Sequence, residues 1–190
     1  MSAASKPLAT AASLVALGDG AFEVLGGELV RKAEPSAEHG DAQAGVVASL
    51  RPAFHRRSGG SDGPGGWWIF TEVDVELAPN DIVRPDLAGW RRDRVPERPT
   101  GRPVRIRPDW ICEVLSASNA NTDLVEKLAL YSRVGVPHYW IVDPQTETLT
   151  VHRLVPEGYL IAMRVGKDAV VRAEPFEAVE LRVCTFFGGE

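Results

Sequence analysis

The sequence contains little cysteine and no long apolar run. Only Cys112 and Cys184 occur among 190 residues, and two cysteines, one of them inside an apolar strand pattern, form neither a disulfide framework nor a metal-binding knuckle. No apolar stretch is long enough to cross a bilayer. The short apolar run near the N-terminus is followed by Gly18, Asp19 and Gly20, which favours a helix over an export signal. We therefore expect a protein of the reducing cytoplasm with no membrane partner.

A general excess of positive charge is also missing. The formal net charge is −5, which argues against a protein that coats nucleic acid through bulk electrostatics but allows a local basic patch. The segment 84–107 holds such a patch, with eight arginines and three acidic residues. We interpret it as a loop that contacts a phosphate backbone through Arg84, Arg91, Arg92 and Arg94, with strongly salt-dependent binding. A merely solvated loop is the alternative.

Length and composition favour one domain over residues 1–190. A chain with 44% hydrophobic and 25% charged residues suits a single core. We expect a loose tail over residues 1–8 and a flexible loop over residues 57–66, which hold five glycines. Periodicity and turn residues predict helices from residue 10, over 41–54 and after residue 121. They predict strands over 22–30 (a hairpin), 67–77, 82–88, 110–115, 138–142, 149–154, 159–165 and 169–171, and a last apolar segment over 179–187.

One carboxylate lies in the middle of an apolar strand pattern. Glu113 has apolar residues on both sides. Burying a carboxylate without a partner costs roughly several kcal/mol, so this side chain must be compensated or protonated. It is either a chemical site or a structural acid paired with an arginine such as Arg107 or Arg133. The local pattern does not separate the two interpretations.

Three residues together suggest phosphodiester chemistry. Asp86 follows a proline in a predicted strand, Glu113 lies in a buried strand, and Lys127 lies on the helix after it. Two carboxylates from neighbouring strands can bind a hard divalent cation such as Mg²⁺, and a nearby ammonium can orient the attacking water or stabilise charge on phosphorus. Taken singly, Asp86 is more simply a turn residue, and Lys127 an exposed helix lysine paired with Asp123.

The arrangement differs from the nuclease pattern PD-(D/E)XK, in which the lysine stands two residues after the acid on one strand. Leu115 occupies that position here. Lys127 can replace the missing lysine only if its helix lies across the strand with this face inward. The spacing places Lys127 on one stripe with Leu130 and Tyr131, at the border of the helix's buried face.

Four segments resemble, in order and spacing, the Uma-two family of restriction-endonuclease-like proteins: FEVLGGELVRKAEPSAEH, VRPDLAG, RPDWICEVLSASNANTDLVEKLALYSRVGVPHYWIVDP and TLTVHRL. The resemblance covers residues 22–154 and implies an α/β fold of the α+β type, a restriction-endonuclease-like mixed β-sheet flanked by helices. It also implies Asp86 and Glu113 as ligands of Mg²⁺ or Mn²⁺, and Lys127 as a catalytic lysine displaced onto the helix. Glu28 and His39 are implied accessory residues, although His39 also fits a residue at the start of a helix.

The function expected from these residues is that of a metal-dependent endonuclease that hydrolyses DNA phosphodiester bonds and acts as a homodimer. Nothing in the sequence separates DNA from RNA. The alternative is a catalytically inactive module with the nuclease fold that binds a nucleic acid or a protein partner.

Overall fold

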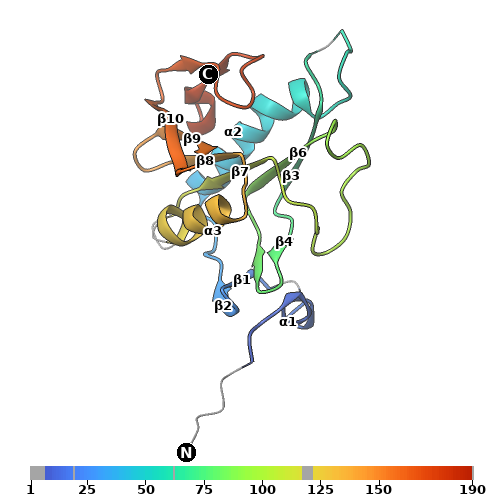
Figure 1. Cartoon of the computed structure of the whole chain (residues 1–190). Helices are drawn as coiled ribbons and strands as arrows, with labels where there is room; N and C mark the ends of the chain where they lie inside the picture. The colour runs from blue at the N-terminus through green and yellow to red at the C-terminus, as the bar shows by residue number, and fades with distance from the viewer. Residues whose placement is uncertain (1–6, 19, 62, 117–121, 190) are drawn as a thin grey trace, which may run out of the picture.

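The structure, a computed structural model, describes residues 7–18, 20–61, 63–116 and 122–189, without the side chain of Asp123. The described residues form three β-sheets with helices packed against them (Figure 1). In chain order the elements are α1 (Ala11–Ala16), β1 (Phe22–Leu25), β2 (Glu28–Arg31), α2 (Ala37–Phe54), β3 (Trp67–Thr71), β4 (Val75–Ala78), β5 (Asp81–Val83), β6 (Leu87–Arg91), β7 (Trp110–Val114), η1 (Thr122–Lys127), α3 (Leu128–Arg133), β8 (His138–Asp143), β9 (Thr148–Val155), β10 (Gly158–Gly166), β11 (Val170–Val171), β12 (Leu181–Arg182) and η2 (Val183–Phe187).

A six-stranded sheet connects the two main cores. Its strand order is β10-β9-β8-β7-β6-β3. Strands β7 and β8 are parallel, and the other neighbouring pairs are antiparallel. Parallel neighbours need a crossover connection, and the segment that contains α3 supplies it. The prediction of a mixed sheet flanked by helices is therefore confirmed.

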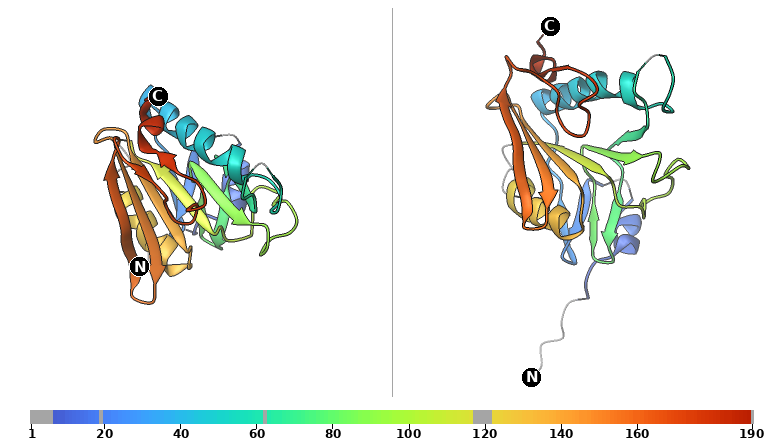
Figure 2. Two further views of the ribbon diagram at one scale, coloured as in Figure 1. Left: turned by 90° about the horizontal axis from the view of Figure 1, so that it is seen from above. Right: turned by 45° about the horizontal axis from the view of Figure 1, so that its top comes forward.

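Helix α2 and the C-terminal segment cover one face of this sheet (Figure 2). The side chain of Ser36 caps α2, because it accepts a hydrogen bond from the backbone N–H of His39 at 3.2 Å. The helix thus begins at Ala37, earlier than predicted. Gly45 permits a close approach to η2, since a Cβ at this position would lie 2.8 Å from the Cα of Phe186. This packing fixes the helix whose first turn carries His39.

The opposite face of the sheet packs on α3. Strand β7 alternates between the two cores: Trp110, Cys112 and Val114 belong to the core under α2, and Ile111 belongs to the core under α3. A strand has a side-chain period of two residues, so Glu113 faces the same side as Ile111. A carboxylate thereby points into the core formed with α3.

A smaller antiparallel sheet has the strand order β2-β1-β5-β4. The predicted hairpin is confirmed as β1 and β2, and it turns at Gly26 and Gly27 with φ of 57° and 84°. Glycine adopts these left-handed values without strain. Helix α1 packs on this sheet through Leu14, whereas Val15 and the following Leu17 are exposed.

Two predicted strands are each divided in the structure. The segment 67–77 breaks at Glu72, whose φ of 52° interrupts an extended chain, so β3 lies in the large sheet and β4 in the small one. The segment 82–88 breaks between β5 and β6. The prediction of continuous strands was wrong at both places, because strand propensity does not report a change of sheet. The backbone N–H of Glu72 donates to the carbonyl of Asp86 at 3.2 Å, so the two breaks are neighbours.

The C-terminal strands follow the prediction more closely. The strands expected over 138–142, 149–154 and 159–165 are confirmed as β8, β9 and β10, and the one over 169–171 is reduced to β11. The last apolar segment divides into β12 and the 3₁₀ helix η2. Residues 117–121, before the predicted helix, and most of the predicted N-terminal tail lie outside the described residues.

Candidate active site

Asp86 lies in the short connection between β5 and β6, where the two larger sheets meet. Its side chain is 2% exposed. The ammonium of Lys32 donates to Oδ1 at 2.8 Å, while Oδ2 accepts the backbone N–H of Val114 at 2.6 Å and lies 3.2 Å from Nε2 of His39. Burial raises the pKa of Asp86, but the hydrogen bond to His39 and the charge of Lys32 outweigh burial and hold the pKa below its usual value. The carboxylate is therefore ionised at neutral pH.

Glu113 is the second buried carboxylate of the site, 1% exposed on β7. Its Oε1 accepts hydrogen bonds from the ammonium of Lys127 at 3.1 Å and from the hydroxyl of Tyr131 at 2.7 Å. Burial and the charge of Glu113 raise the pKa of Tyr131, so this hydroxyl stays protonated. The backbone N–H of Asp86 donates to Oε2 at 3.3 Å. The structure thus brings the two predicted metal ligands together.

The arginines considered as partners of Glu113 bind elsewhere. Arg107 donates to the carbonyl of Gly135, and Arg133 forms an ion pair with Asp81 at 3.1 Å. Lys127 is the cation that lies against Glu113.

Lys127 is the last residue of the π-helical turn η1, directly before α3. Its ammonium lies between two carboxylates, 3.0 Å from Oε1 of Glu23 and 3.1 Å from Oε1 of Glu113. Its side chain is 1% exposed, so Lys127 lies inside the core and not at the predicted border of the buried face. The same burial argues against an exposed lysine paired with Asp123, whose side chain lies outside the described residues.

Three charged residues of this cluster were not among the predicted site residues: Glu23, Lys32 and Glu72. Glu23 is 2% exposed within β1 and accepts the backbone N–H of Arg84 at 2.7 Å. An acid inside an apolar strand is the signal that identified Glu113, and it could have identified Glu23 as well. Lys32 directly follows β2 and has no comparable local signal, because its partners come from distant parts of the chain.

Glu72 lies at the solvent-facing side of the cluster. Its side chain is 42% exposed and lies 2.8 Å from the ammonium of Lys32, and Gln43 donates to it at 3.2 Å. Burial raises the pKa of Glu72, and the charge of Lys32 opposes that rise. The backbone of Glu72 is left-handed, with a φ of 52°. Such a conformation costs about 1–3 kcal/mol in a residue with a side chain, and residues of this kind concentrate at functional sites.

Of the two implied accessory residues, the cluster contains His39 and not Glu28. His39 is 6% exposed and contacts Asp86 through Nε2, and the hydrogen bond to Asp86 raises the pKa of His39. Within the described part of the chain, its buried Nδ1 has no hydrogen-bond partner. Glu28 is exposed at the start of β2, beside a different cavity lined by Leu8 and Leu29.

The predicted phosphate-binding arginines fall into two groups. Arg84 lies beside the cluster. The others lie at or beyond the far end of β6, and Arg91 is roughly 16 Å from Asp86 at the usual rise of a strand. Each of the three has a partner within the chain: Arg91 binds Asp93, Arg92 binds the carbonyl of Trp67, and Arg94 binds Asp109.

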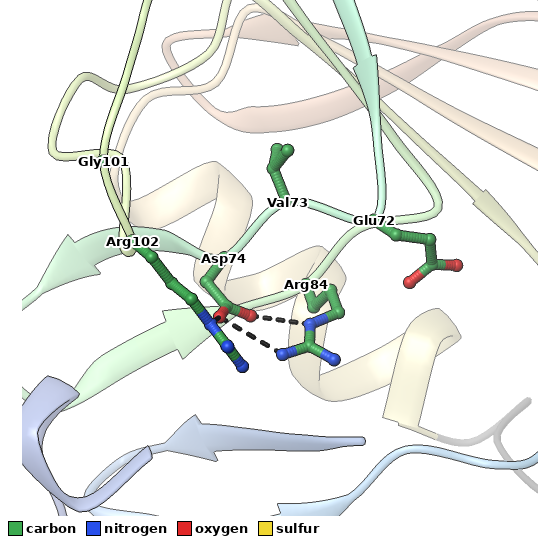
Figure 3. A pocket seen from close by; sticks show the side chains of 6 residues that line it. All are labelled: Glu72, Val73, Asp74, Arg84, Gly101 and Arg102. Carbon is green, nitrogen blue, oxygen red and sulfur yellow. Dashed lines mark hydrogen bonds and ion pairs between the residues drawn. The ribbon is translucent and has the colours of Figure 1, made fainter. Parts of the chain in front are cut away.

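A cavity of about 360 Å³ opens beside Glu72 (Figure 3). Asp74 lies in its wall and binds two guanidinium groups, with Nε of Arg84 at 2.6 Å and Nε of Arg102 at 2.7 Å. Burial raises the pKa of Asp74, but the hydrogen bonds from these arginines hold it below its usual value. Two guanidinium groups thus lie in this part of the wall, next to the site.

The described residues contain neither a cluster of metal ligands nor a membrane-spanning helix. No group of three or more His, Cys, Asp or Glu side chains among them is arranged to hold a metal ion. No helix in the same residues combines the length and the apolar character that crossing a bilayer requires. Lys32 and Lys127 lie against the carboxylates of the cluster.

A mixed sheet with helices on both faces, and with two buried carboxylates and a lysine at its centre, defines a protein of the restriction-endonuclease-like class. The model of the Uma2 family, described as "Putative restriction endonuclease", matches residues 13–184. The chain therefore belongs to the Uma2 family, the family that its sequence segments resemble.

A solved structure with a similar fold supports the assigned fold class. It is described as a "putative nuclease belonging to DUF820 from Anabaena variabilis ATCC 29413", with a TM-score of 0.69 and 20% identity over 95% of this chain and 98% of that chain. No curated protein matches the sequence. The structural likeness supports the fold, and the arrangement of side chains must support the chemistry.

Replacing Lys127 with methionine removes the cation that Glu23 and Glu113 share. Breaking a buried ion pair by removing one partner costs about 3–5 kcal/mol. We expect K127M to lower the free energy of unfolding by about that amount, measured by urea denaturation. The control is K167M, because Lys167 pairs with Glu147 at the surface and an exposed pair contributes little. Equal losses in the two variants would contradict the assignment of Lys127 as an internal cation.

Proposed function

We propose that this chain is a metal-dependent endonuclease that hydrolyses DNA phosphodiester bonds. The observation that carries the proposal is the convergence of Asp86, Glu113 and Lys127, from three separate elements, at one place. Membership of the Uma2 family implies a nucleic acid substrate. DNA as that nucleic acid, Mg²⁺ or Mn²⁺ as the cation, and the cytoplasm as the setting belong to the proposal.

The oxygen atoms at this place suit a hard divalent cation. Oδ1 of Asp86, Oε2 of Glu72 and the carbonyl oxygen of Arg84 accept hydrogen bonds from one ammonium at 2.8, 2.8 and 3.0 Å, so they already converge on a positive charge. Carboxylate and carbonyl oxygens are the ligands that Mg²⁺ and Mn²⁺ prefer. When bound, such a cation polarises a phosphoryl oxygen and lowers the pKa of a water molecule.

The residues of the chain have separate roles in this proposal. Asp86 and Glu113 hold the cation. Tyr131 and Lys127 donate hydrogen bonds to Glu113 and fix its orientation. From the sequence, Lys127 was expected to assist the attacking water directly; its burial changes this to a positioning role that acts through Glu113. His39 positions Asp86 in the same way.

The adjoining cavity is the proposed place for the DNA backbone. Arg84 and Arg102 lie in its wall, and Glu72 connects it to the cluster. Guanidinium groups bind phosphate through paired N–H donors. A phosphate held there lies next to the carboxylates that carry the proposed chemistry.

Cleavage of supercoiled plasmid and of single-stranded DNA tests the proposed activity. With Mg²⁺ or Mn²⁺ we expect the wild type to cut, and D86N and E113Q to lose at least about 100-fold in rate, the scale reported for removal of one transition-state contact. Chelation should stop the wild type, and added metal should restore it. Absence of cutting with either metal, or cutting that both substitutions leave unchanged, would contradict the proposal.

Two tyrosines provide a matched control for this assay. The hydroxyl of Tyr131 donates to Glu113, and the hydroxyl of Tyr159 donates to the carbonyl of Val136, both at 2.7 Å. Y131F and Y159F each remove one hydrogen bond, which is worth about 1 kcal/mol of stability. Only Y131F should slow cleavage, by roughly tenfold if orientation of Glu113 is worth about 1.4 kcal/mol. Equal rates in the two variants would remove Tyr131 from the active arrangement.

The proposed contact with DNA predicts a salt effect. R102Q should weaken DNA binding and reduce the slope of log K against log salt concentration by about 1, the loss of one phosphate contact. R91Q changes an arginine at the far end of β6 and is the control. Fluorescence anisotropy over a salt series measures both slopes. A reduced slope for R91Q alone would place the DNA backbone along Arg91, Arg92 and Arg94 instead of the cavity.

A homodimer is part of the proposal, since nucleases that cut both strands of a duplex often pair two sites. Strand β10 lies at the edge of the large sheet, and it exposes Leu160 at 47% and Ile161 at 54%. An open edge strand can pair with a second copy. Light scattering should give twice the chain mass of 20.6 kDa, and a mass that stays at the single-chain value at high concentration would exclude the dimer.

One observation favours the alternative function, an inactive module that binds a nucleic acid or a protein. The carboxylate oxygens of Asp86 and Glu113 already accept hydrogen bonds within the chain, so a metal ion would compete with these donors for the same carboxylates. An inactive module would bind DNA with the same affinity in the presence of a chelator, and it would not cut.

A further inference from the structure

Lys32 is bound by a set of oxygens that could equally hold a metal ion. Its ammonium donates to Oδ1 of Asp86 at 2.8 Å, to Oε2 of Glu72 at 2.8 Å and to the carbonyl of Arg84 at 3.0 Å. An ammonium has three N–H donors, so these acceptors use all of them. Two carboxylates and a carbonyl are also a ligand set of a hard divalent cation. The same oxygens therefore suit either occupant.

Among the described residues, the cluster has more negative than positive charge. Four of their carboxylates share two ammonium groups, those of Lys32 and Lys127, and a protonated His39 would still leave this sum negative. In a partly buried site this excess is weakly screened by salt. A divalent cation in place of one ammonium reduces the excess, so the exchange is electrostatically favourable.

The side chain of Lys32 lies near the surface and can move away from these oxygens, whereas the side chain of Lys127 is enclosed. The side chain of Lys32 is 10% exposed and that of its partner Glu72 is 42% exposed, while Lys127 and Glu113 are each 1% exposed. The ammonium of lysine is carried on a flexible four-carbon stem. Burial lowers the pKa of Lys32, but the charges of the nearby carboxylates raise it above its usual value. Lys32 thus stays charged, and two cations cannot share one set of oxygens.

We propose that, in the metal-free protein, the ammonium of Lys32 occupies the binding position of the divalent cation. Metal binding then displaces this ammonium from Asp86 and Glu72. The inference rests on the proposed function, because it concerns the cation of that same site. It adds Glu72 and the carbonyl of Arg84 to the ligands Asp86 and Glu113. Lys32 then sets the metal affinity, since every metal ion must compete with a cation that is part of the chain.

Calorimetric titration with MnCl₂ tests this displacement. K32M removes the competing charge and should bind Mn²⁺ about tenfold more tightly than the wild type, or more, given that one charge at contact distance shifts a neighbouring equilibrium by one to three powers of ten. K167M removes a surface lysine and should bind as the wild type does. Unchanged or weaker binding by K32M overturns the proposal. K32Q, which keeps amide donors without the charge, should also bind more tightly and serves if K32M does not fold.

Thermal unfolding gives a second measurement that does not depend on activity. Without metal, K32M should melt below the wild type, because Asp86 and Glu72 lose their counter-ion; Mn²⁺ should then raise its Tm by more than it raises that of the wild type. D86N should remove the Mn²⁺ effect in both backgrounds. An effect of Mn²⁺ that survives D86N would show that the ion binds elsewhere, and this would overturn the displacement.

The two proposals fail in different ways. A wild type that cuts DNA with Mn²⁺, beside a K32M variant that binds the ion no more tightly, overturns the displacement alone. Absence of Mn²⁺ binding in the wild type, K32M and K32Q overturns the displacement together with the metal dependence of the proposed function.

Discussion

The burial of carboxylates is the physical constraint on which this site depends. Asp86 and Glu113 are each 1% exposed, and a carboxylate in the protein interior must be matched by a cation or by donors. The chain meets this requirement with Lys32, Lys127 and the hydroxyl of Tyr131. Glu113 lies on β7 and Asp86 in the β5–β6 connection. Lys32 follows β2, and Lys127 and Tyr131 belong to η1 and α3. Compensation of charge thus ties together elements that are far apart in the sequence.

The sequence predicts a residue of this site only where its neighbours along the chain already mark it as unusual. Glu113 was identified because an acid inside an apolar run is visible in a few residues. Asp86 and Lys127 needed the family resemblance as well. Lys32 and Glu72 could not be found in either way, since the role of Lys32 is defined by partners more than 35 positions away and that of Glu72 by a change of sheet within an apparently continuous strand.

Charge counts along the chain had a similar limit. The arginine-rich segment was predicted to be a phosphate-binding loop, yet much of its charge is matched by acids from other segments: Arg84 and Arg102 bind Asp74, and Arg94 binds Asp109. The segment does contain more arginines than acidic residues, but which acids pair with these arginines depends on the tertiary structure. The fold class was more accessible, because the family resemblance implies it. Short local signals, the apolar run of β7 and the glycine pair Gly26 and Gly27, also predicted their own elements.

Because Asp86 lies between β5 and β6, the site is built from residues of two different sheets. Strand β5 belongs to the small sheet and β6 to the large one, and Lys32, which follows the hairpin of the small sheet, reaches across to Asp86. The carboxylate cluster can therefore keep its geometry only while the small sheet remains docked. Local undocking would scatter the cluster while leaving the six-stranded sheet folded, so the chain can be well folded by most spectroscopic criteria and still lack an assembled site.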